Sequence, residues 1–151
     1  MADHLSSVQA ALRQLKAHLQ REKAALKESD VGNRSFLLGD FHVCLAECLG
    51  NSLLADTLRD FTARTTLIAM RYQSSHDAAL SCQDHVAIVE ALAAGDSARA
   101  EALMAEHLSS VQAALRLPAD DDPLQQLREA LAPLPSTTSS TAEPAYLGAL
   151  L

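Results

Sequence analysis

Histidine and cysteine are the residue types with the greatest capacity for chemistry in this sequence, which has six histidines and three cysteines. Cys44 and Cys48 lie one helical turn apart, a spacing that a redox pair or a metal pair can use. Neither has a nearby Lys or Arg that would lower the pKa of its thiol, so we interpret both as small buried residues. Cys82 makes the number odd, and no secretory signal begins the sequence. We therefore expect a reducing, cytoplasmic environment without a disulfide framework.

The sequence lacks the motifs that mark common catalytic sites. It has no Gly-x-Ser-x-Gly elbow, phosphate loop, dinucleotide fingerprint or His-Glu-x-x-His pair. Its formal net charge of −7 comes without a basic cluster, which argues against direct DNA binding by this chain. No stretch reaches the roughly 18 apolar residues that span a bilayer. We expect neither an enzyme, nor direct DNA binding, nor membrane insertion.

The elements that must position these side chains are helices, because Ala and Leu are abundant and no proline precedes Pro118. Apolar residues at alternating steps of three and four predict a first helix, whose stripe is broken only by Glu22. Gly50 and Asn51 form a left-handed stop, and Ser52 can cap the third helix. Gly39 inside the second helix indicates a close approach of two helices. The five expected helices cover residues 3–28, 34–49, 52–72, 78–95 and 97–117, the last capped by Asp96.

The predicted fold class is therefore all-α, an antiparallel bundle of about five long helices plus a short C-terminal helix. A change of composition at Pro118 divides the chain into a helical domain, residues 1–117, and a remainder, residues 118–151. In the remainder we expect an acidic linker, a short helix over 123–131 and a disordered Ser/Thr-rich tail.

One segment of the sequence occurs twice. Residues 1–13 return as residues 104–116, and only Asp3 and Glu106 differ. Solenoid repeats recur at a fixed period and diverge, so an isolated near-copy indicates duplication, recombination or construction. We interpret the start of the first helix as a copy of the fifth, with His4 standing in for His107. Because both copies carry the same apolar face, exchange of a helix between two chains is a hypothesis that follows from the repeat.

An ordered set of motifs resembles the FCD effector-binding domain of FadR-subfamily GntR transcription regulators. The set consists of Phe-His, Gly-Asn, Asp-His, Gly-Asp and His-Leu, carried by residues 37–51, 63–68, 84–96 and 104–108. The resemblance implies an antiparallel helical bundle around a pocket that holds a divalent metal and a small carboxylate. It also implies an N-terminal winged-helix DNA-binding domain, for which we expect no room in 151 residues.

The family pattern implies metal ligands at three histidines of this sequence, His42, His85 and His107. Its fourth ligand is an Asp four residues before the first histidine, where this sequence has Leu38. Asp40 is about 200° around the helix from His42 and should point away from the site. Three imidazoles can still bind zinc or nickel, with an open position for water or a carboxylate. Weaker affinity, or no metal at all, is equally consistent with the sequence.

Three further residues are candidates for the effector site. Glu22 either forms a salt bridge with an Arg of a neighbouring helix or faces the pocket and compensates for the missing Asp. Arg64 resembles a clamp for the effector's carboxylate, and surface ion pairing is the alternative. Asn51 supplies the left-handed stop after the second helix and belongs to the Gly-Asn motif of the resemblance.

The remaining histidines receive other interpretations. His18 is expected on the outer face beside Lys16 and Gln20, and His76 in a polar loop, so both should be solvated. His4 has no predicted place.

The leading functional hypothesis is an effector-sensing domain of a GntR-type regulator without its DNA-binding half. It would bind a small organic acid with a divalent metal and form a homodimer. The alternatives are a structural or interaction bundle whose pocket binds nothing, and a small metalloenzyme that uses three histidines.

Overall fold

The computed structural model describes residues 2–114, with side chains from Ser6 onward, and all of this part folds as helices and their connections. The five helices are α1 (Ala2–Ala25), α2 (Val31–Cys48), α3 (Ser52–Tyr72), α4 (Ser75–Ala93) and α5 (Ser97–Ala114). No strand occurs among the described residues, so the all-α prediction is correct. The chain divides into two units, Met1–Leu117 and Pro118–Leu151, and the five helices belong to the first. The short helix and tail expected after Pro118 lie outside the described residues.

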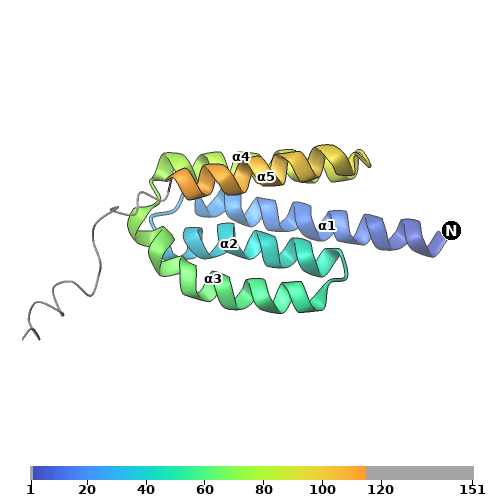
Figure 1. The fold of residues 1–151 in the computed structure, drawn as a ribbon, viewed down its shortest axis with the longest axis horizontal. Helices are drawn as coiled ribbons and strands as arrows, with labels where there is room; N and C mark the ends of the chain where they lie inside the picture. Colours follow the sequence, from blue (N-terminus) through green and yellow to red (C-terminus); the bar gives the residue numbers. More distant parts are fainter. Residues whose placement is uncertain (1, 115–151) are drawn as a thin grey trace, which may run out of the picture. The chain divides into compact units, whose positions relative to one another are not determined.

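The helices pack antiparallel along the bundle axis (Figure 1). α2 contacts α1 on one side and α3 on the other, α4 packs against α5, and α1 and α2 both contact α4. The resulting core joins residues of α1, α2 and α4, with half-buried Leu103 and Met104 of α5 packed against it. Its buried members are Leu15, Leu19, Phe41, Cys44, Ile88 and Val89.

Helix ends follow local capping chemistry more closely than the apolar pattern alone predicts. α2 begins at Val31 rather than residue 34, because the Asp30 side chain accepts the Asn33 N–H and caps the helix. α4 begins at Ser75, because Ser74 caps it in the same way. The cap that Asp96 was predicted to give α5 is present, since its carboxylate accepts the Arg99 N–H at 3.0 Å.

The turn between α2 and α3 corrects the role predicted for Asn51. Gly50 holds the left-handed conformation with φ of 74°, whereas Asn51 has φ of −97°. The Asn51 side chain accepts the Leu54 N–H at 3.0 Å and so caps α3, the role expected of Ser52. Glycine takes the left-handed position because it has no Cβ to clash there, which leaves the Asn side chain free to cap.

Gly39 marks the closest approach of α2 and α3, as its position inside a helix predicted. A Cβ added to Gly39 would lie 2.8 Å from Thr62 Cγ2. The Thr62 hydroxyl also donates to the Gly39 carbonyl at 3.3 Å. This contact holds α3 against α2 along one wall of the site described below.

The substitution Gly39→Ala should lower the free energy of unfolding by about 1–3 kcal/mol, because the added methyl group overpacks the helix contact. In the double variant Gly39→Ala/Thr62→Ser, loss of the Thr62 methyl should restore part of that stability, while the serine keeps the hydroxyl. Urea denaturation followed by circular dichroism measures both. Equal stability of Gly39→Ala and the unsubstituted chain would contradict the close approach.

Candidate metal centre and effector cavity

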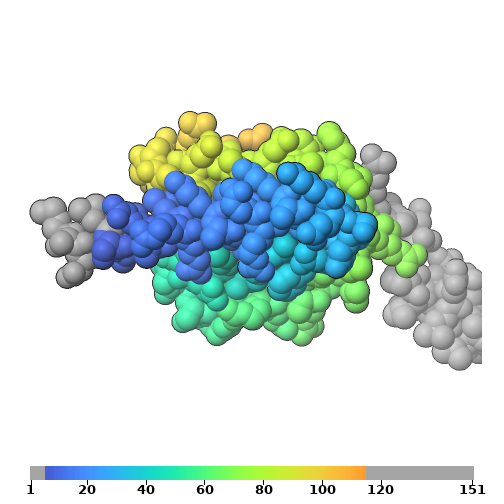
Figure 2. All heavy atoms as spheres, turned by 180° about the vertical axis from the view of Figure 1, so that it is seen from behind, coloured from blue at the N-terminus to red at the C-terminus, as the bar shows by residue number. Residues whose placement is uncertain are grey.

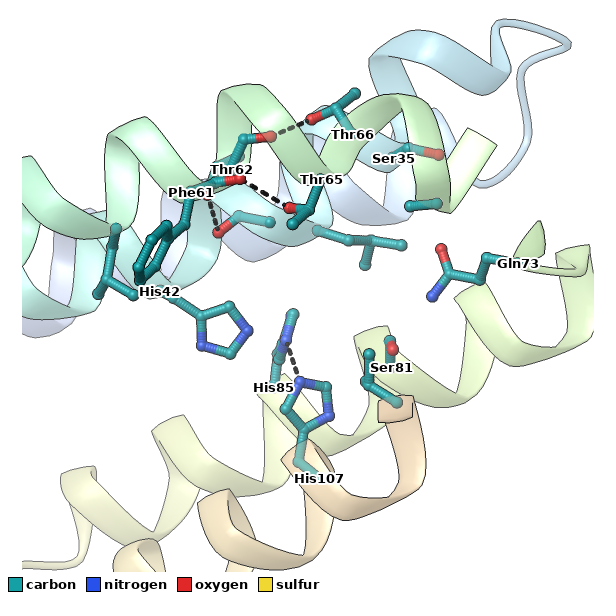
Figure 3. A pocket seen from close by; sticks show the side chains of 15 residues that line it. Ser35, His42, Phe61, Thr62, Thr65, Thr66, Gln73, Ser81, His85 and His107 are labelled. Atoms are coloured by element: carbon teal, nitrogen blue, oxygen red, sulfur yellow. Dashed lines mark hydrogen bonds between the residues drawn. The ribbon is translucent and has the colours of Figure 1, made fainter. Parts of the chain in front are cut away.

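Three histidines from three different helices meet inside the bundle. His42 comes from α2, His85 from α4 and His107 from α5 (Figure 3). One ring nitrogen of each lies within 4.8 Å of the others. His85 and His107 are buried, and His42 is half-buried. The structure thus brings together the three residues that the family pattern implied as ligands.

Carboxylates hold the outer nitrogens of two of these rings. His85 Nδ1 lies 3.0 and 3.1 Å from the two oxygens of Glu22, and His107 Nδ1 lies 3.1 Å from Asp84 Oδ2. An ionised carboxylate can only accept a hydrogen bond, so each Nδ1 carries the proton and donates it. In a neutral imidazole, Nε2 is then left with a lone pair.

The two Nε2 atoms face each other across the centre of the site. His85 Nε2 and His107 Nε2 are 3.1 Å apart (Figure 3, dashed line). With both protons on the Nδ1 side, two lone pairs converge on one region. Such a pair is repulsive unless a cation or a proton lies between the nitrogens.

Burial keeps the imidazoles of His42 and His107 in their neutral, ligating form. Burial and the neighbouring rings of His85 and His107 lower the pKa of His42 from 6.5 to about 3. Burial and His85 also lower the pKa of His107, against the opposing effect of Asp84. The Phe41 ring stacks on His85 with centroids 3.8 Å apart and covers one of its faces. Near neutral pH, His42 and His107 are therefore uncharged.

Glu22 remains ionised although it is 1% exposed. Burial by itself would raise its pKa, but hydrogen bonds from His18 and His85 lower it. His18 Nε2 lies 3.3 Å from Glu22 Oε1 and 3.0 Å from the Leu37 carbonyl. Burial would lower the pKa of His18, and these two partners raise it instead. His18 and Glu22 thus form a buried pair behind His85.

A cavity of about 250 Å³ opens beside the three imidazoles. Most of its wall is apolar, and no Lys, Arg, Asp or Glu lines it in the described part of the chain. The hydroxyl of Ser35 is buried there without a hydrogen-bond partner. The polar side chains around the cavity, other than the histidines, are Ser35, Thr62, Thr65, Thr66, Gln73 and Ser81.

Comparison with known proteins assigns this arrangement to a family. The family described as "FCD domain" matches residues 4–110. The chain belongs to the FCD family. No curated protein and no solved structure gave a significant match. FCD domains are the regulatory, effector-sensing domains of GntR-type regulators, and none of the described helices is long and apolar enough to cross a bilayer.

This FCD domain lacks the carboxylate that the family pattern places before the first histidine. Leu38 fills that position, is buried, and packs against Ala78 and Cys82. Asp40 points elsewhere, as its helical position predicted, since its Oδ2 lies 3.9 Å from His18 Nδ1. Among the described residues, the carboxylates paired with the imidazoles of the cluster are those of Glu22 and Asp84, both on outer nitrogens.

None of the three predicted effector residues lines the cavity. The Arg64 side chain is 74% exposed and pairs with Asp60 at 3.2 Å, so its position favours the surface alternative over a carboxylate clamp. Asn51 is exposed and caps α3. Glu22 has two histidines as partners instead of the Arg of the salt-bridge alternative. It orients His85 and does not line the cavity.

The prediction that His18 is solvated is wrong, because its exposure is 4%. The sequence nevertheless indicated a buried position for His18. Steps of three and four residues place it on one helix face with Leu15, Glu22 and Ala25. The role of Asp84 as the partner of His107 was also not predicted. This residue adjoins His85 in the sequence but reaches α5, which only the packing of α4 on α5 reveals.

The interpretation of the paired cysteines as buried residues is confirmed for Cys44 and only in part for Cys48. All three are free, Cys44 and Cys82 are buried, and Cys48 is half-buried. Burial raises the pKa of Cys44 and that of Cys82 to about 12, so neither thiol is reactive at neutral pH.

The substitution Glu22→Ala should lower the free energy of unfolding by about 3–5 kcal/mol, because it leaves His18 and His85 buried without their anion. The matched control Glu28→Ala removes an exposed carboxylate and should change stability by less than about 0.5 kcal/mol. Chemical denaturation of metal-free protein measures both. Equal effects of the two substitutions would contradict a buried Glu22 network.

Proposed function

We propose that this FCD domain senses a small organic acid with the help of a divalent metal ion held by His42, His85 and His107. The observation that supports this proposal is the 3.1 Å approach of two Nε2 atoms whose outer nitrogens donate to carboxylates. A histidine that ligates a metal commonly donates its other N–H to a carboxylate, which fixes the tautomer and makes the ring a better ligand. His85 and His107 both meet that condition.

The donor set fits zinc or nickel. Imidazole nitrogen suits both ions, and metal–nitrogen bonds of about 2.0–2.1 Å place neighbouring tetrahedral ligands about 3.3–3.4 Å apart. The 3.1 Å separation of the two Nε2 atoms is close to that value, and small side-chain rotations can accommodate the difference. When bound, the ion would supply a Lewis-acidic centre with at least one position open to an exchangeable ligand.

The chain's own residues account for the preference for a carboxylate. Three neutral imidazoles leave the charge of a divalent ion uncompensated, and Leu38 adds no oxygen. An acid in the adjoining cavity would bring its negative charge to this centre, and no basic side chain among the described lining residues competes for that charge. The unpartnered Ser35 hydroxyl can donate to the acid. The apolar wall, which includes Leu58 and Phe61, favours a small compact molecule.

We further propose that the domain acts by binding rather than catalysis, in line with the regulatory character of its family. The homodimer and the cytoplasmic location inferred from the sequence remain predictions. A structural bundle without a ligand is the alternative that the following experiments separate from sensing.

Purified chain should bind about one zinc or nickel ion, and binding should raise the melting temperature by mass action. The substitution His85→Ala should abolish both effects, because it removes a ligand. The control His76→Ala replaces an exposed histidine and should change neither. Metal analysis and thermal denaturation with and without a chelator measure these effects. Binding of equal strength in His85→Ala, or none in the unsubstituted chain, would contradict the metal centre.

With zinc bound, a panel of small acids such as malonate, succinate and citrate should include members that raise the melting temperature further. The same acids should have little effect on His85→Ala. Stabilisation by the metal but by no acid would favour a structural metal site over a sensor.

Zinc binding should persist to lower pH than it does for exposed histidines. Three imidazoles with a pKa of 6.5 would each be half protonated at pH 6.5, which would weaken binding about eightfold relative to high pH. The lowered pKa values of His42 and His107 shift proton competition at these rings to more acidic pH. Between pH 7.5 and 6.5, three such unperturbed imidazoles would lose about sixfold in affinity. The affinity measured by competition with a chelator should therefore fall by clearly less than sixfold over this range. A full sixfold loss would contradict the neutral, buried cluster.

A further inference from the structure

The docking face of α5 is made by residues that the sequence repeats. Met104 packs against the core, His107 is 2% exposed, and Val111 lines the cavity. These residues are spaced by three and four positions and so lie on one face of the helix. All three belong to the repeated segment, and their counterparts in the first copy are Met1, His4 and Val8.

The only difference between the two copies falls off this face. Glu106, the counterpart of Asp3, is exposed on α5. Both residues are acidic, so the exchange alters neither the docking face nor its charge. Residues 1–11 therefore carry the same docking-face side chains as residues 104–114, the described part of the second copy.

The first copy extends away from its own bundle. The N-terminal end of α1 projects beyond the ends of the other four helices (Figure 1). From the opposite side, the first blue residues extend past the neighbouring helices in the same way (Figure 2). Val8 is 41% exposed, and α1 becomes half-buried only at Ala11 and Leu12. Among the residues whose side chains are described, residues 6–10 of this first copy are thus exposed on their own bundle.

We propose that the N-terminal segment of one copy can occupy the α5 groove of a second copy, with His4 taking the place of His107. The groove offers the polar surroundings that His107 now has, with the Asp84 carboxylate 3.1 Å from its Nδ1 and His85 Nε2 3.1 Å from its Nε2. Because the side chains are the same, the incoming segment can make the same contacts. The part of this proposal that concerns the metal rests on the proposed function, whereas the exchange of helices does not.

Each chain's own α5 has the advantage of being tethered to its groove. A tethered helix competes at a high effective concentration, and α5 is further held by buried Ala100 and by Leu103, which lie outside the repeat. The segment of a second copy should therefore enter when the docking face of α5 is damaged while that of α1 is intact.

The first test compares His107→Ala with His4→Ala/His107→Ala at about 100 μM chain, by light scattering with and without zinc. The His107→Ala variant should still bind about one zinc ion per chain, because His4 of another copy completes the site. For the same reason, adding zinc should at least double its molecular mass. The double variant should neither bind zinc in this way nor change mass. The same mass and zinc content in both variants, or zinc bound by monomeric His107→Ala, would overturn the proposal.

The second test needs no metal. In the presence of a chelator, Val111→Asp places a charge on the α5 face, and the chain should gain a dimer or larger assembly that is absent from Val8→Asp/Val111→Asp. Equal masses of the two variants, with helical content retained by circular dichroism, would overturn the exchange. Failure of the unsubstituted chain to bind zinc would count against the proposed metal centre alone, since this second comparison decides the exchange independently.

Discussion

The hydrogen bonds that run from His85 to Glu22 and from His107 to Asp84 are the constraint on which the rest of the site depends. By placing both ring protons on the outer side, they leave two lone pairs 3.1 Å apart at the centre of the bundle. The fold tolerates this arrangement because the helices that carry these groups are fixed elsewhere by apolar packing. Its polar cost is the physical reason for proposing a cation between the two nitrogens.

The bundle is built so that four helices share this centre. α1 supplies Glu22 and His18, α2 supplies His42 and the stacking Phe41, α4 supplies Asp84 and His85, and α5 supplies His107. On its helix, each of these polar residues lies close to residues of the apolar core. Loading of the site would therefore affect the packing of all four helices at once, which is the physical basis for a regulatory response.

The sequence was sufficient for the fold because proline is absent from the first 117 residues and the apolar spacing is regular. It placed α3 at its observed bounds, and the family resemblance singled out the three histidines that three helices bring together. Capping side chains at Asp30 and Ser74 moved two other helix starts, since a hydrogen bond to an N–H decides an end that hydrophobicity leaves open. His18 was misplaced because a polar side chain in a polar neighbourhood suggests solvent, although its spacing from Leu15 and Glu22 indicated the buried face. Asp84 and the exposed position of Arg64 depend on how helices are rotated against one another, which a single sequence does not specify.

The central claim concerns where two protons lie, and long-range ¹H–¹⁵N NMR of the histidine rings tests it most directly. In zinc-loaded protein, the account predicts a proton on Nδ1 of both His85 and His107 and a metal-bound Nε2 on each ring. Zinc addition should therefore shift the Nε2 resonances strongly and leave the Nδ1–H groups hydrogen-bonded to their carboxylates. A proton on Nε2 of either ring, or Nε2 resonances unchanged by zinc, would contradict it.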